Sequence, residues 1–226
     1  TWERAAFIRA RPVAGDLALG NIFLEQIQSF IWRKTLDYTV MEDMQTMLRR
    51  PPQGNGWRGY NGVSIEGVWV AEEGGVLHLV GRPKKSPHVN IITEARYDDF
   101  DLHFEWKVEE GTNSGVMFHV GEGPKQPYLT GPEYQVLDNF GFRSGKGEPV
   151  GPKEHTASNY AIEAAASDET KPIGEWNESR IVVQGNHVEY WLNGVKTTEY
   201  EMHSVKWNEQ IANAKFSKWE DFATLG

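Results

Sequence analysis

Residues 99–108 read Asp-Phe-Asp-Leu-His-Phe-Glu-Trp-Lys-Val, an unbroken alternation of polar and apolar side chains. Successive side chains of a β-strand point to opposite faces of the sheet, so a period of two predicts a strand with one face in a core and the other in water. This is the clearest strand in the sequence. It predicts a half-buried antiparallel sheet, and the neighbouring segments are interpreted from it.

Segments with the same period lie on both sides of this strand. Residues 67–70 and 76–80 predict a hairpin across residues 71–75. Residues 180–200 predict three further strands separated by the turns Gln184-Gly185-Asn186 and Asn193-Gly194, and Asn-Gly between alternating segments is a strong hairpin signal. No βαβ pattern occurs, so the fold class that these segments predict is all-β, as an antiparallel β-sandwich.

The first part of the chain has a different period. From Ile22 to Leu48 the apolar residues recur at spacings of three and four, which predicts an amphipathic helix that Arg50-Pro51-Pro52 ends. We therefore divide the chain into a helical accessory segment, residues 1–53, and a sandwich domain, residues 54–226. The helix is expected to pack on the domain, or to dock a partner or a second copy. No strong period appears over residues 207–226.

Composition excludes several classes of function. The 226 residues carry a formal net charge of −9 with acids and bases interspersed, which disfavours a nucleic-acid or anionic-membrane partner. The absence of cysteine excludes a disulfide framework, a thiol nucleophile and a thiolate zinc site. No apolar run reaches the roughly 20 residues of a membrane span, and no export signal opens the chain. Nine tryptophans are typical of sugar-handling domains.

Two segments carry most of the candidate chemistry: residues 113–119, Asn-Ser-Gly-Val-Met-Phe-His, and residues 131–139, Gly-Pro-Glu-Tyr-Gln-Val-Leu-Asp-Asn. On a strand, Glu133 and Gln135 share one face about 7 Å apart, and His119 is also expected to point away from the core. A carboxylate beside an amide can hold a sugar hydroxyl and act as general acid or base. An ordinary solvated sheet face is the alternative interpretation, and residues 113–115 are equally compatible with a simple turn.

The seven histidines are scattered, without a His-x-x-x-His pair. His119 and His155 are predicted at a strand end and in a long loop, where functional residues concentrate, so both are candidates for catalysis. The sequences His103-Phe104-Glu105 and His187-Val188-Glu189 have His-x-Glu spacing on alternating strands. With no cysteine to complete a zinc motif, we interpret both as surface pairs.

Seven short motifs occur in a characteristic order over roughly Gly54 to Phe222. They are Gly56-Trp57-Arg58-Gly59-Tyr60-Asn61, Val68-Trp69-Val70 with Gly75-Val76-Leu77, Tyr97-Asp98-Asp99-Phe100-Asp101-Leu102, Asn113-Ser114-Gly115-Val116, Gly131 to Asn139, Gly174-Glu175-Trp176-Asn177 and Trp191-Leu192-Asn193-Gly194-Val195. Together they resemble the 3-keto-disaccharide hydrolase family. The resemblance implies the concanavalin A-like jelly-roll sandwich of lectins and glucanases. The closing strand of that family would follow Gly226, so we expect a domain that lacks its last strand.

The same resemblance implies a reaction. The substrate would be a glycoside already oxidised at C3 by a separate sugar 3-dehydrogenase, cleaved by removal of the C2 proton, elimination of the C1 aglycone and addition of water. Glu133 is then the expected base or metal ligand, with His119 or His155 as its acid/base partner. A divalent metal is left open, with Glu133 and His119 as candidate ligands, and no other cofactor is expected. The expected substrate-binding residues are Asn113, Gln135, Asp138, Lys153, Tyr160 and Trp176.

The resemblance also implies a bacterial protein that works in the periplasm or outside the cell. Two rival classes stay open at this stage. A non-catalytic carbohydrate-binding module is the first, because the same sandwich supports lectins and a fold does not settle function. A helix-bearing interaction protein, in which residues 1–50 dock a partner, is the second.

Overall fold

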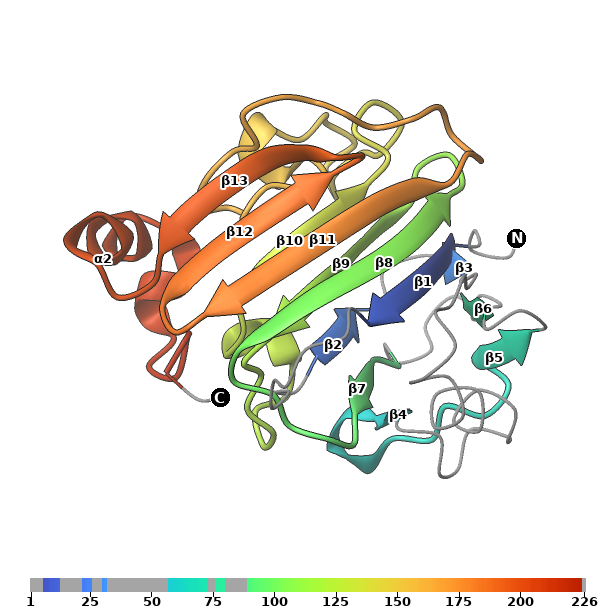
Figure 1. The fold of residues 1–226 in the computed structure, drawn as a ribbon, viewed down its shortest axis with the longest axis horizontal. Helices are drawn as coiled ribbons and strands as arrows, with labels where there is room; N and C mark the ends of the chain where they lie inside the picture. Colours follow the sequence, from blue (N-terminus) through green and yellow to red (C-terminus); the bar gives the residue numbers. More distant parts are fainter. Residues whose placement is uncertain are drawn as a thin grey trace.

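A computed structural model describes residues 6–12, 22–25, 30–31, 57–72, 76–79 and 89–224. In this part of the chain two open sheets lie one behind the other (Figure 1). The larger sheet has eight strands, in the spatial order β13 (Val195–Glu201), β12 (His187–Leu192), β11 (Asn177–Gln184), β8 (Phe100–Val108), β1 (Ala6–Pro12), β3 (Phe30–Ile31), β6 (Val76–Leu79) and β5 (Trp69–Glu72). The smaller has five, in the order β10 (Glu133–Leu137), β9 (Asn113–Phe118), β2 (Ile22–Glu25), β7 (Ile91–Thr93) and β4 (Trp57–Gly59).

The helical elements of the described residues are short. They comprise one α-helix, α2 (Val205–Ala212), and the 3₁₀ turns η1 (Tyr60–Gly62), η2 (Pro127–Leu129), η3 (Pro152–Glu154) and η4 (Lys215–Lys218). Within the described ranges, no helix is both long and apolar enough to span a bilayer. The all-β prediction is confirmed, whereas the jelly-roll order of connections stays a prediction.

The predicted strand at residues 99–108 is β8, and its alternation sets the position of the core. Phe100, Phe104 and Trp106 are almost fully buried, while the residues between them are only partly covered. β8 pairs antiparallel with β11 on one side and with β1 on the other. The main core lies between the sheets, where these side chains meet residues of the smaller sheet and of β11 and β12, including Val116, Phe118, Tyr134, Val136, Ile181, Val188 and Tyr190.

Both predicted hairpin systems are confirmed. β5 pairs with β6, and β11, β12 and β13 form an antiparallel meander, with a shift of register in β12 between Tyr190 and Trp191. In Figure 1 the meander lies in front of β9 and β10. Asn193, at the second turn, has φ +50° and Gly194 has φ +84°, which is the left-handed pair that an Asn-Gly turn supplies at little cost.

The predicted N-terminal helix is not found where the structure describes that segment. Residues 22–25 and 30–31 are strands, β2 and β3, and the rest of the range 22–48 lies outside the described residues. β2 pairs with both β9 and β7, and β1 pairs with β8 and β6, so each takes an interior position in its sheet. A continuous apolar run such as Ile22-Phe23-Leu24 suits a strand with neighbours on both sides as well as it suits a helix, and periodicity cannot separate the two.

The helix α2 was not predicted from the sequence. Ser204 begins it, because its side-chain oxygen accepts a hydrogen bond from the backbone N–H of Trp207. The Trp207 ring stacks on Tyr200 with 5.1 Å between ring centroids, and it also stacks on Phe222. Aromatic packing against the end of β13 therefore stabilises a segment whose own apolar period is weak.

Candidate functional site

The candidate site is built on the antiparallel pair β9 and β10. Glu133 lies opposite Met117, and Gln135 lies opposite Gly115. Tyr134, between them, points into the core, where its ring packs edge-on against Phe104 with 5.6 Å between centroids. Because neighbouring residues of a strand alternate, Glu133 and Gln135 share the outer face of the five-stranded sheet, as their spacing predicted.

The carboxylate of Glu133 lies directly over Gly115. A Cβ atom added to Gly115 would be 2.0 Å from Glu133 Oε1 and 2.7 Å from its Cδ, so no other residue type fits at position 115 without moving the glutamate. Glu133 is only 7% exposed and Gln135 only 1%. The interpretation of these two residues as a solvated sheet face is therefore wrong.

An apolar cluster borders Glu133 on the same face. Met117, which is paired with Glu133, belongs to a small buried group with Tyr60, Ile92 and Val120. The Tyr60 hydroxyl donates to the backbone oxygens of Gly121 and Pro124, each at 3.0 Å, which ties the loop after β9 to η1. Burial, with a contribution from the Glu122 carboxylate, raises the pKa of Tyr60 to about 12, so the phenol stays protonated at neutral pH.

A charged pair holds the same loop from its outer side. The Arg58 guanidinium contacts both carboxylate oxygens of Glu122, and these hydrogen bonds hold the pKa of Glu122 below its usual range. Arg58 lies on β4 and Glu122 follows β9, so the pair joins β4 to the loop after β9. The sequence offered no spacing signal for this contact, because 64 residues separate the partners.

Asp138 organises the turn that follows β10. Its Oδ2 accepts from the Gly111 N–H at 2.7 Å, and its Oδ1 accepts from the N–H groups of Phe140 and Gly141, at 3.3 and 2.8 Å. A Cβ at Gly141 would be 1.9 Å from Oδ2, so the turn also requires glycine there. Asp138 is only 5% exposed, and its hydrogen bonds hold the loops beside β9 and β10 in place.

Replacing Asp138 by alanine is expected to lower the free energy of unfolding by about 2–3 kcal/mol, because three backbone N–H groups lose a charged acceptor. Asp138→Asn should cost less, since its amide oxygen can still serve Phe140 and Gly141 while its NH₂ faces the Gly111 donor. Urea unfolding of the three proteins measures both values. Equal stability of Asp138→Ala and the unmodified chain would contradict this role.

β10 is the last strand of the five-stranded sheet, and residues 156–160 hydrogen-bond along its outer side. The Gln135 carbonyl accepts from Ala157 N–H at 2.9 Å, and the Glu133 carbonyl accepts from Tyr160 N–H at 3.0 Å. Tyr160 is partly buried, with Lys215 Nζ 4.1 Å from its ring centroid. The predicted binding residue Asn113 is partly buried opposite Leu137, at the far end of the same strand pair.

The two candidate histidines lie at different ends of the site. His155 follows η3 and packs edge-on against Phe140, 6.3 Å between centroids. The backbone N–H of Leu137 donates to Thr156 Oγ1 at 2.8 Å, so His155 lies near the last residue of β10, which is four residues, or about 13 Å along the strand, from Glu133. Lys153, in η3, is exposed, and its carbonyl accepts from Ser158 and Ala161.

His119 does not share the face of Glu133, contrary to expectation. Its backbone is left-handed, with φ +51°, and this turns the ring against Phe100 and Phe118, with 6.4 and 5.3 Å between ring centroids. Its Nε2 lies 2.9 Å from the carbonyl oxygen of Asp98. His119 lines a cavity of about 380 Å³ at one end of the sandwich, together with Asp98, Asp99, Gly185, Asn186, Met202, His203, Ala223 and Thr224.

Two further expectations concern residues away from Glu133. Trp176 precedes β11 on the larger sheet, where Lys107 Nζ lies 5.3 Å from its ring centroid. Among the described residues, the side chains close enough to share a metal ion are His187, Glu189 and Glu199, a group to which neither Glu133 nor His119 belongs. The structure thus gathers Asn113, Glu133, Gln135, Asp138 and Tyr160 along β9 and β10, and places His119 and Trp176 elsewhere.

Comparison with known proteins assigns the family. Residues 53–220 match the model of the 3-keto-alpha-glucoside-1,2-lyase-like domain. The chain belongs to this family. The resemblance drawn from the seven motifs is confirmed, and the matched range contains every residue of the candidate site named above.

Two relatives support the same family. A 3-keto-disaccharide hydrolase of Bacteroides thetaiotaomicron is 31% identical over 180 residues, which are 73% of this chain and 62% of that protein, so the chain spans about three fifths of the length of this relative. The crystal structure of a candidate glycosyl hydrolase from Parabacteroides distasonis superposes with a TM-score of 0.65 at 32% identity, covering 76% of this chain and 78% of the other.

A third similarity is short. A bifunctional glutamine synthetase adenylyltransferase/adenylyl-removing enzyme of Xanthobacter autotrophicus is 48% identical over 67 residues. That stretch is 30% of this chain and only 6% of the enzyme, so it transfers no activity.

Proposed function

We propose that this chain cleaves 3-keto-glycosides, with Glu133 as the base that removes the C2 proton. The supporting observation is the buried carboxylate of Glu133, which lies on the backbone of Gly115 next to the Gln135 amide. Family membership and the name of the Bacteroides relative support the substrate class. A carboxylate screened from water by Met117 and its apolar neighbours is less hydrated than a surface carboxylate, which favours proton abstraction.

The reaction follows from the ketone. A C3 carbonyl acidifies the C2–H bond, so Glu133 takes that proton and the electron pair becomes an enolate. The enolate re-forms the C3 carbonyl and a C1=C2 double bond while the C1–O bond breaks. The aglycone leaves and takes one proton from water, the hydroxide that this forms adds to C1, and the proton held by Glu133 returns to C2, which restores the carboxylate. No pair of carboxylates at glycosidase spacing is needed.

The remaining residues of the site are assigned to binding. Gln135 and Asn113 lie along the strand pair that starts at Glu133, and we propose that they hold sugar hydroxyls while Asp138 holds the loops around them. His155 lies toward the other end of β10 and His119 has turned into the end cavity, so we assign neither to the proton transfer at C2. Supply of the substrate requires an enzyme that oxidises a sugar C3 hydroxyl, and we propose a periplasmic or extracellular location.

The direct test is incubation of the chain with a 3-keto-glucoside and with its unoxidised parent, following release of the aglycone. We expect release from the keto sugar and no release above background from the parent, because only the ketone makes the C2 proton removable. Binding of both sugars with similar affinity and no turnover would contradict the proposal, and would favour a lectin-like module.

A further inference from the structure

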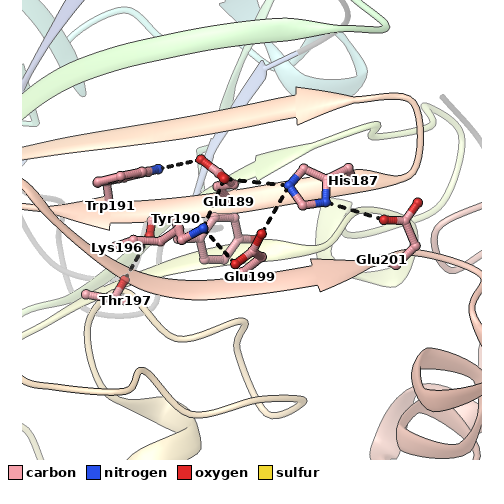
Figure 2. A network of polar contacts seen from close by, with 8 residues as sticks. All are labelled: His187, Glu189, Tyr190, Trp191, Lys196, Thr197, Glu199 and Glu201. Carbon is pink, nitrogen blue, oxygen red and sulfur yellow. Dashed lines mark hydrogen bonds and ion pairs between the residues drawn. The ribbon is translucent and has the colours of Figure 1, made fainter.

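The β12–β13 hairpin carries a second cluster of chemically competent side chains, which the proposed reaction does not use. Register pairs His187 with Glu201 and Glu189 with Glu199, so all four side chains lie on the outer face of the eight-stranded sheet (Figure 2). The side chains of His187 and Glu189 are 39% and 20% exposed, and that of Glu199 is 48% exposed. Glu133 lies on the other sheet of the sandwich, so this cluster is a separate site.

The distances within the cluster are unusual for hydrogen bonds. His187 Nε2 lies 3.6 Å from Glu189 Oε1 and 3.5 Å from Glu199 Oε1, which is too long for good N–H···O geometry. One ligand atom from each of the three residues fits within a span of 4.8 Å. Ligands bonded to a tetrahedral zinc-type ion at about 2.0–2.2 Å are about 3.3–3.6 Å apart, so both imidazole–carboxylate distances match edges of such a tetrahedron.

The other ring nitrogen of His187 also has a carboxylate beside it. Nδ1 lies 3.4 Å from Glu201 Oε2, which is also long for a hydrogen bond but close enough for the negative charge to attract the ring proton to Nδ1. A carboxylate at this position favours the tautomer with hydrogen on Nδ1, which leaves the lone pair of Nε2 directed toward Glu189 and Glu199. Metal-binding histidines in proteins are almost always oriented in this way.

A second hydrogen bond orients Glu189. The indole N–H of Trp191 donates to its Oε2 at 2.8 Å, which leaves Oε1 on the side of His187. Glu201 thus contacts Nδ1 of His187, and Trp191 contacts Oε2 of Glu189. His187 Nε2 and Glu189 Oε1 are the atoms that face the space shared with Glu199 (Figure 2). This arrangement distinguishes the cluster from a group of acidic side chains that merely lie near one another.

Charge balance favours a cation at the same place. Three carboxylates face one ammonium group, Lys196, whose Nζ lies 2.6 Å from Glu199 Oε2 and 3.2 Å from Glu189 Oε1. Without His187, the local sum of these four side chains is +1 − 3 = −2. The neighbouring polar group on this face is different, because Asp101 is held at 2.7 and 2.6 Å by both arms of Arg180 and its charge is neutralised.

We propose that His187, Glu189 and Glu199 form a binding site for a divalent transition metal ion of the Zn²⁺ class. Glu201 positions the imidazole, Lys196 competes with the ion for the carboxylates, and the bound ion joins β12 to β13. His-x-Glu spacing alone indicated only a surface pair, because the third ligand comes from the next strand. Nitrogen with two carboxylate oxygens suits Zn²⁺ better than Ca²⁺ or Mg²⁺, which prefer oxygen ligands.

The test is titration of Zn²⁺ into the chelator-treated full chain by calorimetry, with Co²⁺ as a spectroscopic probe. We expect one site that disappears in His187→Asn and in Glu199→Gln, visible Co²⁺ absorption of the intensity that four-coordinate cobalt shows, and a rise in Tm with Zn²⁺. Glu201→Gln should weaken affinity by about 10-fold, as loss of a partner of a ligating histidine commonly does. Lys196→Met should strengthen it, because the competing ammonium is removed.

His103→Asn is the matched control, since His103 is also a partly exposed histidine on this sheet face with a carboxylate, Asp101, at 3.2 Å. Its affinity for Zn²⁺ should equal that of the unmodified chain. The proposal is overturned if the unmodified chain does not bind Zn²⁺, if His187→Asn binds it equally well, or if His103→Asn loses the same site. Circular dichroism of each variant shows that the fold is retained.

Discussion

Replacing Glu133 by glutamine is expected to lower kcat for a 3-keto-glucoside by about 10²–10⁴-fold, the range over which a positioned acid or base contributes. Glutamine has nearly the same shape and can occupy the space above Gly115, but its amide cannot accept the C2 proton. The substrate still meets Gln135 and Asn113, so KM should change little. Initial rates of aglycone release over a range of substrate concentrations separate the two parameters.

The control for this experiment is Glu175→Gln, an exposed glutamate before β11 on the larger sheet. It removes the same charge without touching β9 or β10, so its kcat should equal that of the unmodified chain. If Glu133→Gln keeps its full rate, or if Glu175→Gln loses as much, Glu133 is not the base. A rise in KM at unchanged kcat would make Glu133 a binding residue only.

Adding one methyl group at Gly115 is expected to have the second largest effect. The new Cβ of Gly115→Ala would lie 2.0 Å from Glu133 Oε1, so the carboxylate has to leave its position. Both residues are buried, and overpacking of this kind typically costs about 1–3 kcal/mol of stability. A displacement of about 1 Å in a catalytic group can lower the rate by about 10²-fold. We therefore expect both kcat and the free energy of unfolding to decrease in Gly115→Ala.

A double-mutant cycle isolates the contact. In the Glu133→Ala background the atoms that would clash are absent, so Gly115→Ala should cost much less stability there than in the unmodified chain. Gly145→Ala is the matched control, because an added Cβ meets nothing within 4 Å and the backbone is not in the left-handed region. Equal costs of Gly115→Ala in both backgrounds would show that Glu133 does not occupy the space above residue 115.

Local pattern predicted much of the sandwich. The alternation of residues 99–108 predicted which side chains of β8 face the core and which face solvent. Asn193-Gly194 predicted the turn between β12 and β13. The shared face of Glu133 and Gln135 followed from their spacing. These features depend on side-chain alternation or on backbone preferences of a few consecutive residues, which are encoded locally.

Other features depended on contacts between distant segments. The left-handed backbone of His119 turned its ring to the end cavity, and a single such residue leaves no period in the sequence. The segment of residues 22–25 became a strand between β9 and β7, because pairing on both sides satisfies its backbone groups. α2 was missed because aromatic packing against Tyr200 stabilises it.

The sequence by itself determined the all-β class, the strand that holds Glu133 and the family to which its motifs belong. Only the tertiary structure decided that Glu133 is buried over Gly115, that His119 is separated from it, and that Glu199 lies beside His187 in the proposed metal site. The physical reason is the range of the interactions. Alternation and turn chemistry act within a few residues, whereas burial, charge pairing and ligand geometry depend on which strands become neighbours.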